Sequence, residues 1–252
     1  MKKMLFLWLL LQPCFLLAWQ GDVSYFSFDD GILRLDAPAQ ADTAYLSTPL
    51  RAAINAHWEA TVQMEYLPSS SNLVRVYLMA DTTCLTTLLN GNYVQIGGAK
   101  KTISLHRQEG AKHTLLLTAP DDVLLQAPVQ VSIKVSRSDA FEWNVHYALD
   151  KGVWVSMASV VDMVMTQNKA WGMWCKYTKT RNKAFAFSAL SATGDTCAVL
   201  PVKPIDNVYI TEVLYDPYPS GVDFVELYNA SADAIDLSRC VLSNGKKEVK
   251  LP

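Results

Sequence analysis

Strict alternation of apolar and polar residues is the feature that most constrains the fold of this 252-residue chain. The segment 57–66, HWEATVQMEY, places five apolar side chains on one side of an extended chain: Trp58, Ala60, Val62, Met64 and Tyr66. The segments 129–136 (VQVSIKVS) and 141–149 (FEWNVHYAL) repeat the pattern. A period of two indicates antiparallel strands with one face on a core. Because no segment keeps a 3.6-residue period, we predict an all-β sandwich or jelly roll.

Two prolines mark a domain boundary late in the chain. Pro201 and Pro204 lie in VLPVKPIDN, a stretch that neither a helix nor a central strand tolerates. We therefore expect a large β-domain over 19–200, a linker over 201–206 and a smaller β-unit over 207–252. Since about 45 residues are too few for an independent β-sandwich, we expect the chain to be a fragment of a longer protein.

The N-terminus has the pattern of an export signal. Two lysines precede an apolar run over 4–17 that ends at the small Ala18, which predicts a cleaved signal peptide over 1–18. The run is too short to favour a membrane-spanning helix. A lipoprotein variant would keep Cys14 as a lipid-bearing N-terminus, but Pro13 directly before it fits that pattern poorly. We expect a secreted or cell-surface protein with no membrane span after cleavage.

Charge and cysteine content exclude several functions. Cleavage after residue 18 removes two lysines and changes the formal net charge from -2 to -4. Without clusters of Lys or Arg we expect no nucleic-acid binding. Four cysteines remain, and an even number in an exported protein permits two disulfides. The candidate disulfide cysteines are Cys84, Cys175, Cys197 and Cys240, and we expect Cys175 to pair with Cys197 or Cys84. Partly buried, unpaired thiols are the alternative. The sequence contains no C-x-x-C pair, so we expect neither a zinc site nor thioredoxin-type redox chemistry.

Catalytic motifs are absent from the sequence. The four histidines form neither H-x-x-x-H nor H-E-x-x-H, and no serine lies in a G-x-S-x-G turn. Gly97-Gly98 reads as a hairpin turn, because no lysine and helix follow as in a phosphate loop. We expect no cofactor and no catalytic triad. Calcium is the one possible ion, and nothing in the sequence supports it.

The large domain resembles a concanavalin A-like lectin/glucanase jelly roll. The resemblance rests on FSFDDGILRLD, SSSNLVRVYLMAD, GNYVQIGG, ISLHRQEG and WGMWCKYTKTRNKAFAF. It departs from the family at Ser188, where the final strand often has an acidic residue. The resemblance implies glycan binding, and in some members hydrolysis by two carboxyl groups. The E-x-D-x-x-E strand of laminarinase-like members is absent, and Glu59 and Glu65 share a polar face with Gln63. We therefore expect no enzyme activity.

The C-terminal unit resembles the start of a lamin tail domain, an immunoglobulin-like β-fold. The matching stretches are 210–217, 223–229, 235–238 and 241–243, and Cys240 stands where the family usually has tryptophan. The resemblance implies a contact or spacer unit. We expect the carboxylates of 223–243 to stabilise turns rather than to bind a metal or to catalyse a reaction.

Aromatic residues in the second half of the large domain are the candidates for ligand contact, because sugars stack their apolar faces on aromatic rings. Trp143 lies on the apolar side of its strand, so we expect it in the core. The candidate ligand-binding residues are Trp171, Trp174, Tyr177 and Trp154. The sequence thus predicts an exported, non-catalytic binding or adhesion protein with a glycan or cell-surface protein as its partner. The alternatives are a fragment of a secreted polysaccharide-degrading enzyme and a structural cell-surface spacer.

Overall fold

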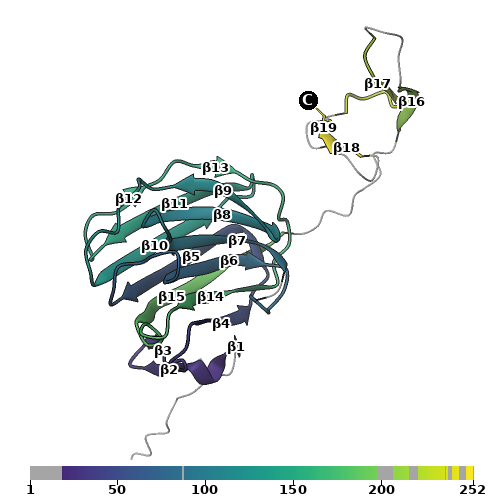
Figure 1. Ribbon diagram of the computed structural model, residues 1–252. Coiled ribbons are helices and arrows are strands. Elements are labelled where there is room, and N and C mark those ends of the chain that lie inside the picture. The colour runs from purple at the N-terminus through teal and green to yellow at the C-terminus, as the bar shows by residue number, and fades with distance from the viewer. Residues whose placement is uncertain are drawn as a thin grey trace, which may run out of the picture. The chain divides into compact units, whose positions relative to one another are not determined.

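The computed structural model describes residues 19–86, 88–197, 207–215, 221–235, 237, 240–243 and 248–251 (Figure 1). The chain divides into two compact units, the first ending at Ala198 and the second beginning at Val199. The predicted signal peptide 1–18 with Cys14, and the predicted linker 201–206, lie outside the described residues.

The first unit contains a seven-stranded antiparallel sheet, sheet A, with the strand order β1-β4-β14-β6-β7-β8-β9. In that order the strands are Gln20–Gly21, Asp42–Pro49, Ala170–Tyr177, Leu73–Ala80, Leu89–Gly97, Thr102–Gly110 and Lys112–Thr118. The Gly97-Gly98 turn joins β7 to β8, as the sequence predicts.

The second sheet of this unit, sheet B, has eight strands in the order β12-β11-β10-β5-β15-β3-β2, with β13 also paired to β11. In that order, ending with β13, the strands are Val155–Ser156, Glu142–Leu149, Val129–Arg137, Ala52–Met64, Phe185–Thr196, Ile32–Leu35, Phe26–Asp29 and Val160–Val161. A short 3-10 turn, η2, spans Val23–Tyr25. The predicted all-β sandwich is confirmed.

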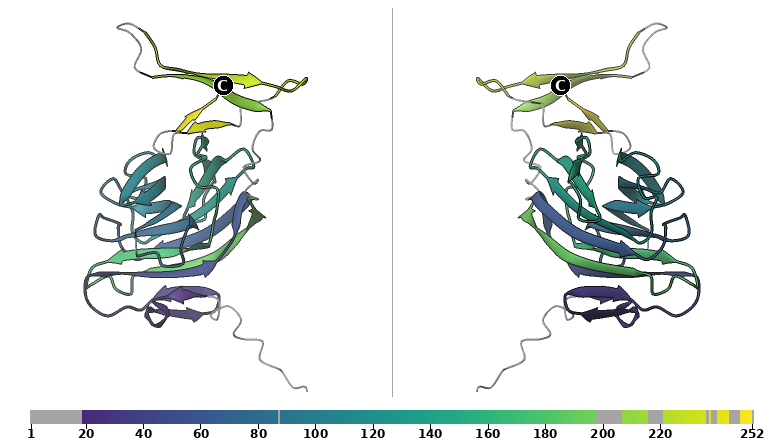
Figure 2. Two further views of the ribbon diagram at one scale, coloured as in Figure 1. Left: turned by 90° about the vertical axis from the view of Figure 1, so that its right-hand side faces the viewer. Right: turned by 90° about the vertical axis from the view of Figure 1, so that its left-hand side faces the viewer.

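The two sheets pack face to face around one core (Figures 1 and 2), because the alternation sends apolar side chains inward from both. Trp58 of β5 and Trp143 of β11 stack with ring centroids 5.5 Å apart, and both are at most 1 % exposed. The expectation that Trp143 lies in the core is confirmed. Tyr66 is 40 % exposed, so its predicted inward position is wrong; β5 ends at Met64, before Tyr66 is reached.

The second unit has two antiparallel hairpins. β16, Val208–Leu214, pairs with β17, Phe224–Asn229, and β18, Val241–Ser243, pairs with β19, Glu248–Lys250. Strands therefore occur in three stretches where the lamin-tail resemblance implies them. The resemblance itself stays a prediction.

Cys175 does not form the disulfide expected from the sequence. It is a free thiol with no exposed surface, and its side chain points into the core from the middle of β14. Burial raises the pKa of this thiol well above its usual range. Cys240 in the second unit is also a free thiol. Neither predicted partner, Cys197 or Cys84, is therefore bonded to Cys175.

Candidate functional site

Two of the four aromatic residues predicted to contact a ligand are buried. Trp171 is 6 % exposed and Tyr177 is 1 % exposed, and both belong to the core between the sheets. They lie on the same side of β14 as Met173 and Cys175, and Trp171 packs against Trp19 with ring centroids 5.9 Å apart. Their rings are covered by protein, so neither offers a face to a sugar. This differs from the expectation for Trp171 and Tyr177.

The other two tryptophans are partly exposed, and they lie on different sheets. Trp174 alternates with the buried residues of β14 and points away from the core, on the outer face of sheet A. Trp154 precedes β12 at the edge of sheet B, is 42 % exposed, and has Lys134 Nζ 4.9 Å from its ring centroid. The structure therefore does not bring these two predicted residues into one site.

Strand register places polar and aromatic residues around Trp174. Trp174 is paired with Tyr45 of β4 on one side and Arg75 of β6 on the other, and Arg75 is paired with Gln95 of β7. In the next row Tyr77 pairs with Tyr93, which pairs with His106 of β8. We call the following residues the aromatic face: Tyr45, Arg75, Tyr93, Gln95, His106 and Trp174.

Arg75 is the centre of the aromatic face. Its guanidinium carbon lies 4.7 Å from the centroid of the Tyr93 ring and 4.9 Å from the centroid of the Trp174 ring. Its Nε donates a hydrogen bond of 3.2 Å to Gln95 Oε1. Such stacking holds a planar guanidinium in one orientation. Among the described residues, no carboxylate forms an ion pair with Arg75.

Two histidines complete one side of the face. The His106 ring stacks on Tyr93 at 5.1 Å with an interplanar angle of 11°, and its Nε2 lies 2.8 Å from Ser104 Oγ. The Tyr93 hydroxyl lies 2.9 Å from His113 Nδ1. Burial lowers the pKa of His106 to about 4, and the charges of Arg75 and His113 act in the same direction. His106 is therefore neutral at pH 7.

The segment 81–86 and the start of β7 cover part of the face. Leu85 and Leu89 are buried against Tyr77 and Tyr93. Ser47 Oγ donates to the carbonyl oxygen of Thr83 at 2.6 Å, which holds the segment against β4. The two tyrosines are therefore a buried floor. Four side chains above them stay half-buried and reachable from solvent: Arg75, Gln95, His106 and Trp174.

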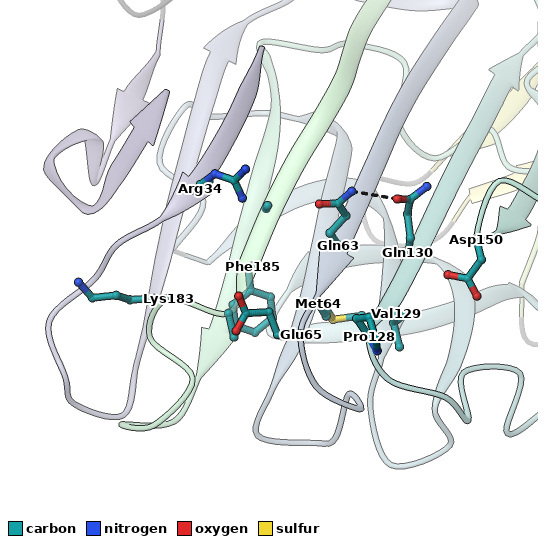
Figure 3. A pocket seen from close by; sticks show the side chains of 12 residues that line it. Arg34, Gln63, Met64, Glu65, Pro128, Val129, Gln130, Asp150, Lys183 and Phe185 are labelled. Atoms are coloured by element: carbon teal, nitrogen blue, oxygen red, sulfur yellow. Dashed lines mark hydrogen bonds between the residues drawn. The ribbon is translucent and has the colours of Figure 1, made fainter. Parts of the chain in front are cut away.

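A cavity of about 310 Å³ on the outer face of sheet B is a second candidate site (Figure 3). Its floor includes Phe185, which is 3 % exposed. Gln63 Nε2 donates to Gln130 Oε1 at 2.9 Å, so these two carboxamides partly satisfy each other. Lys183, at its edge, forms an ion pair with Asp36. This cavity has polar groups but lacks an aromatic ring open to a ligand, so we favour the aromatic face.

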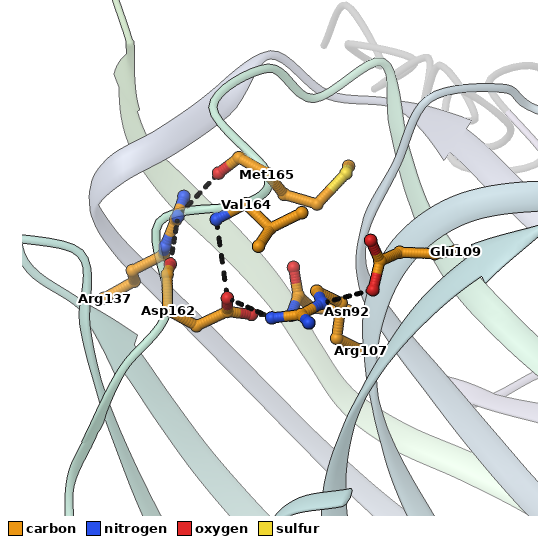
Figure 4. A network of polar contacts seen from close by, with 7 residues as sticks. All are labelled: Asn92, Arg107, Glu109, Arg137, Asp162, Val164 and Met165. Carbon is orange, nitrogen blue, oxygen red and sulfur yellow. Dashed lines mark hydrogen bonds and ion pairs between the residues drawn. The ribbon is translucent and has the colours of Figure 1, made fainter. Parts of the chain in front are cut away.

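A buried polar network at one end of the sandwich stabilises the fold (Figure 4). Arg137 is 1 % exposed and donates to the carbonyl oxygens of Ala53 at 2.7 Å, Asp162 at 3.0 Å and Met165 at 2.6 Å. Burial lowers the pKa of Arg137 to about 10, while the Asp162 charge opposes this change, so Arg137 is charged at neutral pH. Arg137 thereby joins β5 and β10 to the segment 162–165.

The Asp162 carboxylate in this network is already used by protein donors. Arg107 Nη1 lies 2.6 Å from Asp162 Oδ1, and Asn92 Nδ2 lies 3.1 Å from Asp162 Oδ2. With its oxygens facing a guanidinium and an amide, this carboxylate does not fit a calcium ligand set. Within the described parts of the chain, no three His, Cys, Asp or Glu side chains gather as a metal site.

Five members of the aromatic face were missed by the sequence reasoning. Arg75 and Tyr93 lie within LVRVYLMA and NGNYVQIG, where apolar residues on both faces of the strand hide the alternation. One signal could have found Arg75: it lies between Val74 and Val76, so a strand with both valines in the core must point Arg75 to the opposite face. The others are Tyr45, Gln95 and His106.

Comparison with known proteins establishes the fold of the first unit. No family model and no curated protein matches the chain. Among solved structures, the carbohydrate binding module CBM66 from Bacillus subtilis is 8% identical with a TM-score of 0.51, over 70% of this chain and 96% of that one. The VIP36 exoplasmic/lumenal domain, in its Ca²⁺/Man3GlcNAc-bound form, is 10% identical with a TM-score of 0.51, over 73% and 85%.

A third similar structure is the Emp46p carbohydrate recognition domain in its metal-free form, 13% identical with a TM-score of 0.50, over 71% of this chain and 90% of that one. These likenesses show a jelly-roll β-sandwich fold, consistent with the concanavalin-like resemblance. Among the described residues, no helix is long and apolar enough to cross a membrane.

Proposed function

We propose that this chain is an exported carbohydrate-binding protein and that the aromatic face of sheet A binds the glycan. One observation carries the proposal: Arg75 is held between the rings of Trp174 and Tyr93, beside the carboxamide of Gln95, on the side of the sheet that faces away from the core. Aromatic surface next to oriented hydrogen-bonding groups is what recognition of a saccharide requires.

Each part of the face has a chemical role in this proposal. The Trp174 ring packs against the C–H face of a sugar ring. Gln95 and Arg75 donate hydrogen bonds to ring hydroxyls, and Gln95 can also accept. Neutral His106 stacks on Tyr93 and supports the floor of the face.

The similar structures support the proposal by their names, since CBM66 is a carbohydrate binding module and VIP36 is in a mannose-containing, calcium-bound form. Export rests on the predicted signal peptide over 1–18, and the lamin-tail-like unit would act as a contact or spacer unit. Because Glu59, on the outer face of sheet B, pairs with Lys134 at 3.4 Å, a structural role is proposed for this carboxylate rather than catalysis.

A glycan array with and without calcium, followed by calorimetry on any positive glycan, tests this proposal. We expect Trp174→Ala to weaken binding by about tenfold, the effect of one lost aromatic contact. Trp154→Ala is the matched control, since this tryptophan is also partly exposed but lies at sheet B, and we expect it to bind as wild type does. Loss of binding in Trp154→Ala alone would move the site to sheet B. Silence of the folded chain on the whole array, in both conditions, would contradict the proposal.

A further inference from the structure

Resting on the proposed function, we infer that the ligand of the aromatic face is an acidic saccharide and that Arg75 binds its carboxylate or sulfate group. The charge distribution over sheet A is the first argument. Every outward position of β4, β14, β6, β7, β8 and β9 carries a neutral or basic residue, so these strands place no carboxylate on the face. Lys176, exposed and two residues from Trp174, adds a second positive charge.

Two acidic residues that flank strands of sheet A already accept hydrogen bonds from the protein. Asp22 Oδ2 accepts a hydrogen bond of 2.9 Å from the Tyr45 backbone nitrogen, and Asp81 accepts from the backbone and side chain of Asn90 at 3.0 Å and 2.8 Å. Neither carboxylate pairs with Arg75. The guanidinium charge is thus held among aromatic rings without a compensating anion from the described residues.

The charge of Arg75 influences the pKa of side chains on the neighbouring strands. It opposes the burial that raises the pKa of Tyr77 and Tyr93, and it adds to the burial that lowers the pKa of His106 and His113. The charge of Arg75 therefore acts on side chains from β6 to β9, after burial as the larger cause. A half-buried cation without an anionic partner favours an anion there, because its attraction is less screened than in water.

The geometry of the guanidinium suits a planar or tetrahedral oxyanion. The guanidinium carbon lies 4.7 Å and 4.9 Å from the centroids of the Tyr93 and Trp174 rings. Because the N–H groups of a guanidinium lie in its plane, an acceptor binds at its edge. Nε already donates to Gln95. A guanidinium has five N–H donors, which leaves donors for a ligand oxyanion at the edge. The ring of Trp174 lies next to the guanidinium, where the sugar that carries the anion would stack.

Matched oligosaccharide pairs test the inference. The full chain is titrated with hexasaccharides of polygalacturonate, alginate and hyaluronan, each beside the same hexasaccharide reduced at its carboxyl groups. Chondroitin sulfate reduced at its carboxyls is the sulfate-only arm. We expect at least one acidic member to bind about tenfold more tightly than its neutral counterpart. Arg75→Met should remove this preference, so that the acidic chain and its reduced counterpart bind with equal affinity. Arg75→Lys should keep part of the preference for the acidic chain, since lysine retains the positive charge but lacks the planar set of donors of a guanidinium.

Equal binding of acidic and neutral chains by the wild type, with Trp174→Ala still deficient, overturns the acidic ligand and leaves the proposed function intact. Binding of no glycan at all overturns both. Should Arg75→Met fail to fold, the wild-type pairs still decide: the preference for the acidic chain must decrease between about 50 mM and about 500 mM salt. A preference that does not change with salt contradicts a role for the Arg75 charge.

Discussion

Acid should destabilise this protein through His106, because the folded state resists protonation of that ring. Burial against Tyr93, reinforced by Arg75 and His113, lowers the pKa of His106 from 6.5 to about 4. In the unfolded chain His106 takes up a proton near its ordinary pKa of about 6.5. Between these two values the unfolded state binds more protons, so the free energy of unfolding decreases as the pH falls through that window. Below about pH 4 the contribution has been fully lost.

The size of the effect follows from the shift. A difference of about 2.5 pKa units, at about 1.4 kcal/mol for each unit, sets a ceiling of about 3.5 kcal/mol. His106 is only half-buried, so solvent screens part of this energy. We expect about 1–2 kcal/mol of stability to be lost through this residue between about pH 7 and about pH 4.

Urea unfolding of wild type and His106→Gln, at several values between about pH 7 and about pH 4, isolates this contribution. Glutamine keeps a polar group beside Ser104 but does not titrate, so the variant should lose about 1–2 kcal/mol less than wild type over the range. His113→Gln is the matched control on β9. The decrease in its free energy of unfolding over the same pH range should stay closer to that of wild type. Identical pH dependence in wild type and His106→Gln, or titration of the His106 ring near pH 6.5 by NMR, would refute the reasoning.

Two further predictions concern the core. Arg137→Met should lower the free energy of unfolding by about 3–5 kcal/mol, because three buried carbonyl oxygens lose their donor; Arg51→Met, at an exposed position, should change it by less than about 0.5 kcal/mol in the same urea titration. Cys175 should resist alkylation in the native protein and react once urea unfolds it, since its thiol is fully buried and its pKa is raised. Mass spectrometry showing modification of Cys175 under native conditions would contradict this burial.

Sequence reasoning was most successful where one face of a strand is polar. In β10 the residues Val131, Ile133 and Val135 are buried and alternate with more exposed neighbours, as predicted. The alternation is visible in the sequence because the outer face of sheet B is solvated. It fails in β6, where residues on both faces are buried, and the outward Tyr77 looks like another core residue.

The candidate site shows the same limit. Trp171 and Trp174 are three residues apart, so a strand must place them on opposite faces. The sequence alone cannot decide which of them faces the core. That choice depends on Trp19 and on the strands that flank β14, and the result is a buried Trp171 and a reachable Trp174.

By itself, the sequence determined the all-β class of the fold, because a period of two gives each strand one apolar face and no segment has the helical period of an element that could cover it. It also determined that Trp143 enters the core. Only the tertiary structure decided that Arg75 lies between Trp174 and Tyr93, since these three residues come from three strands whose order in the sheet differs from their order in the chain. Long-range strand pairing, which no local pattern records, brings the cation and the two rings together.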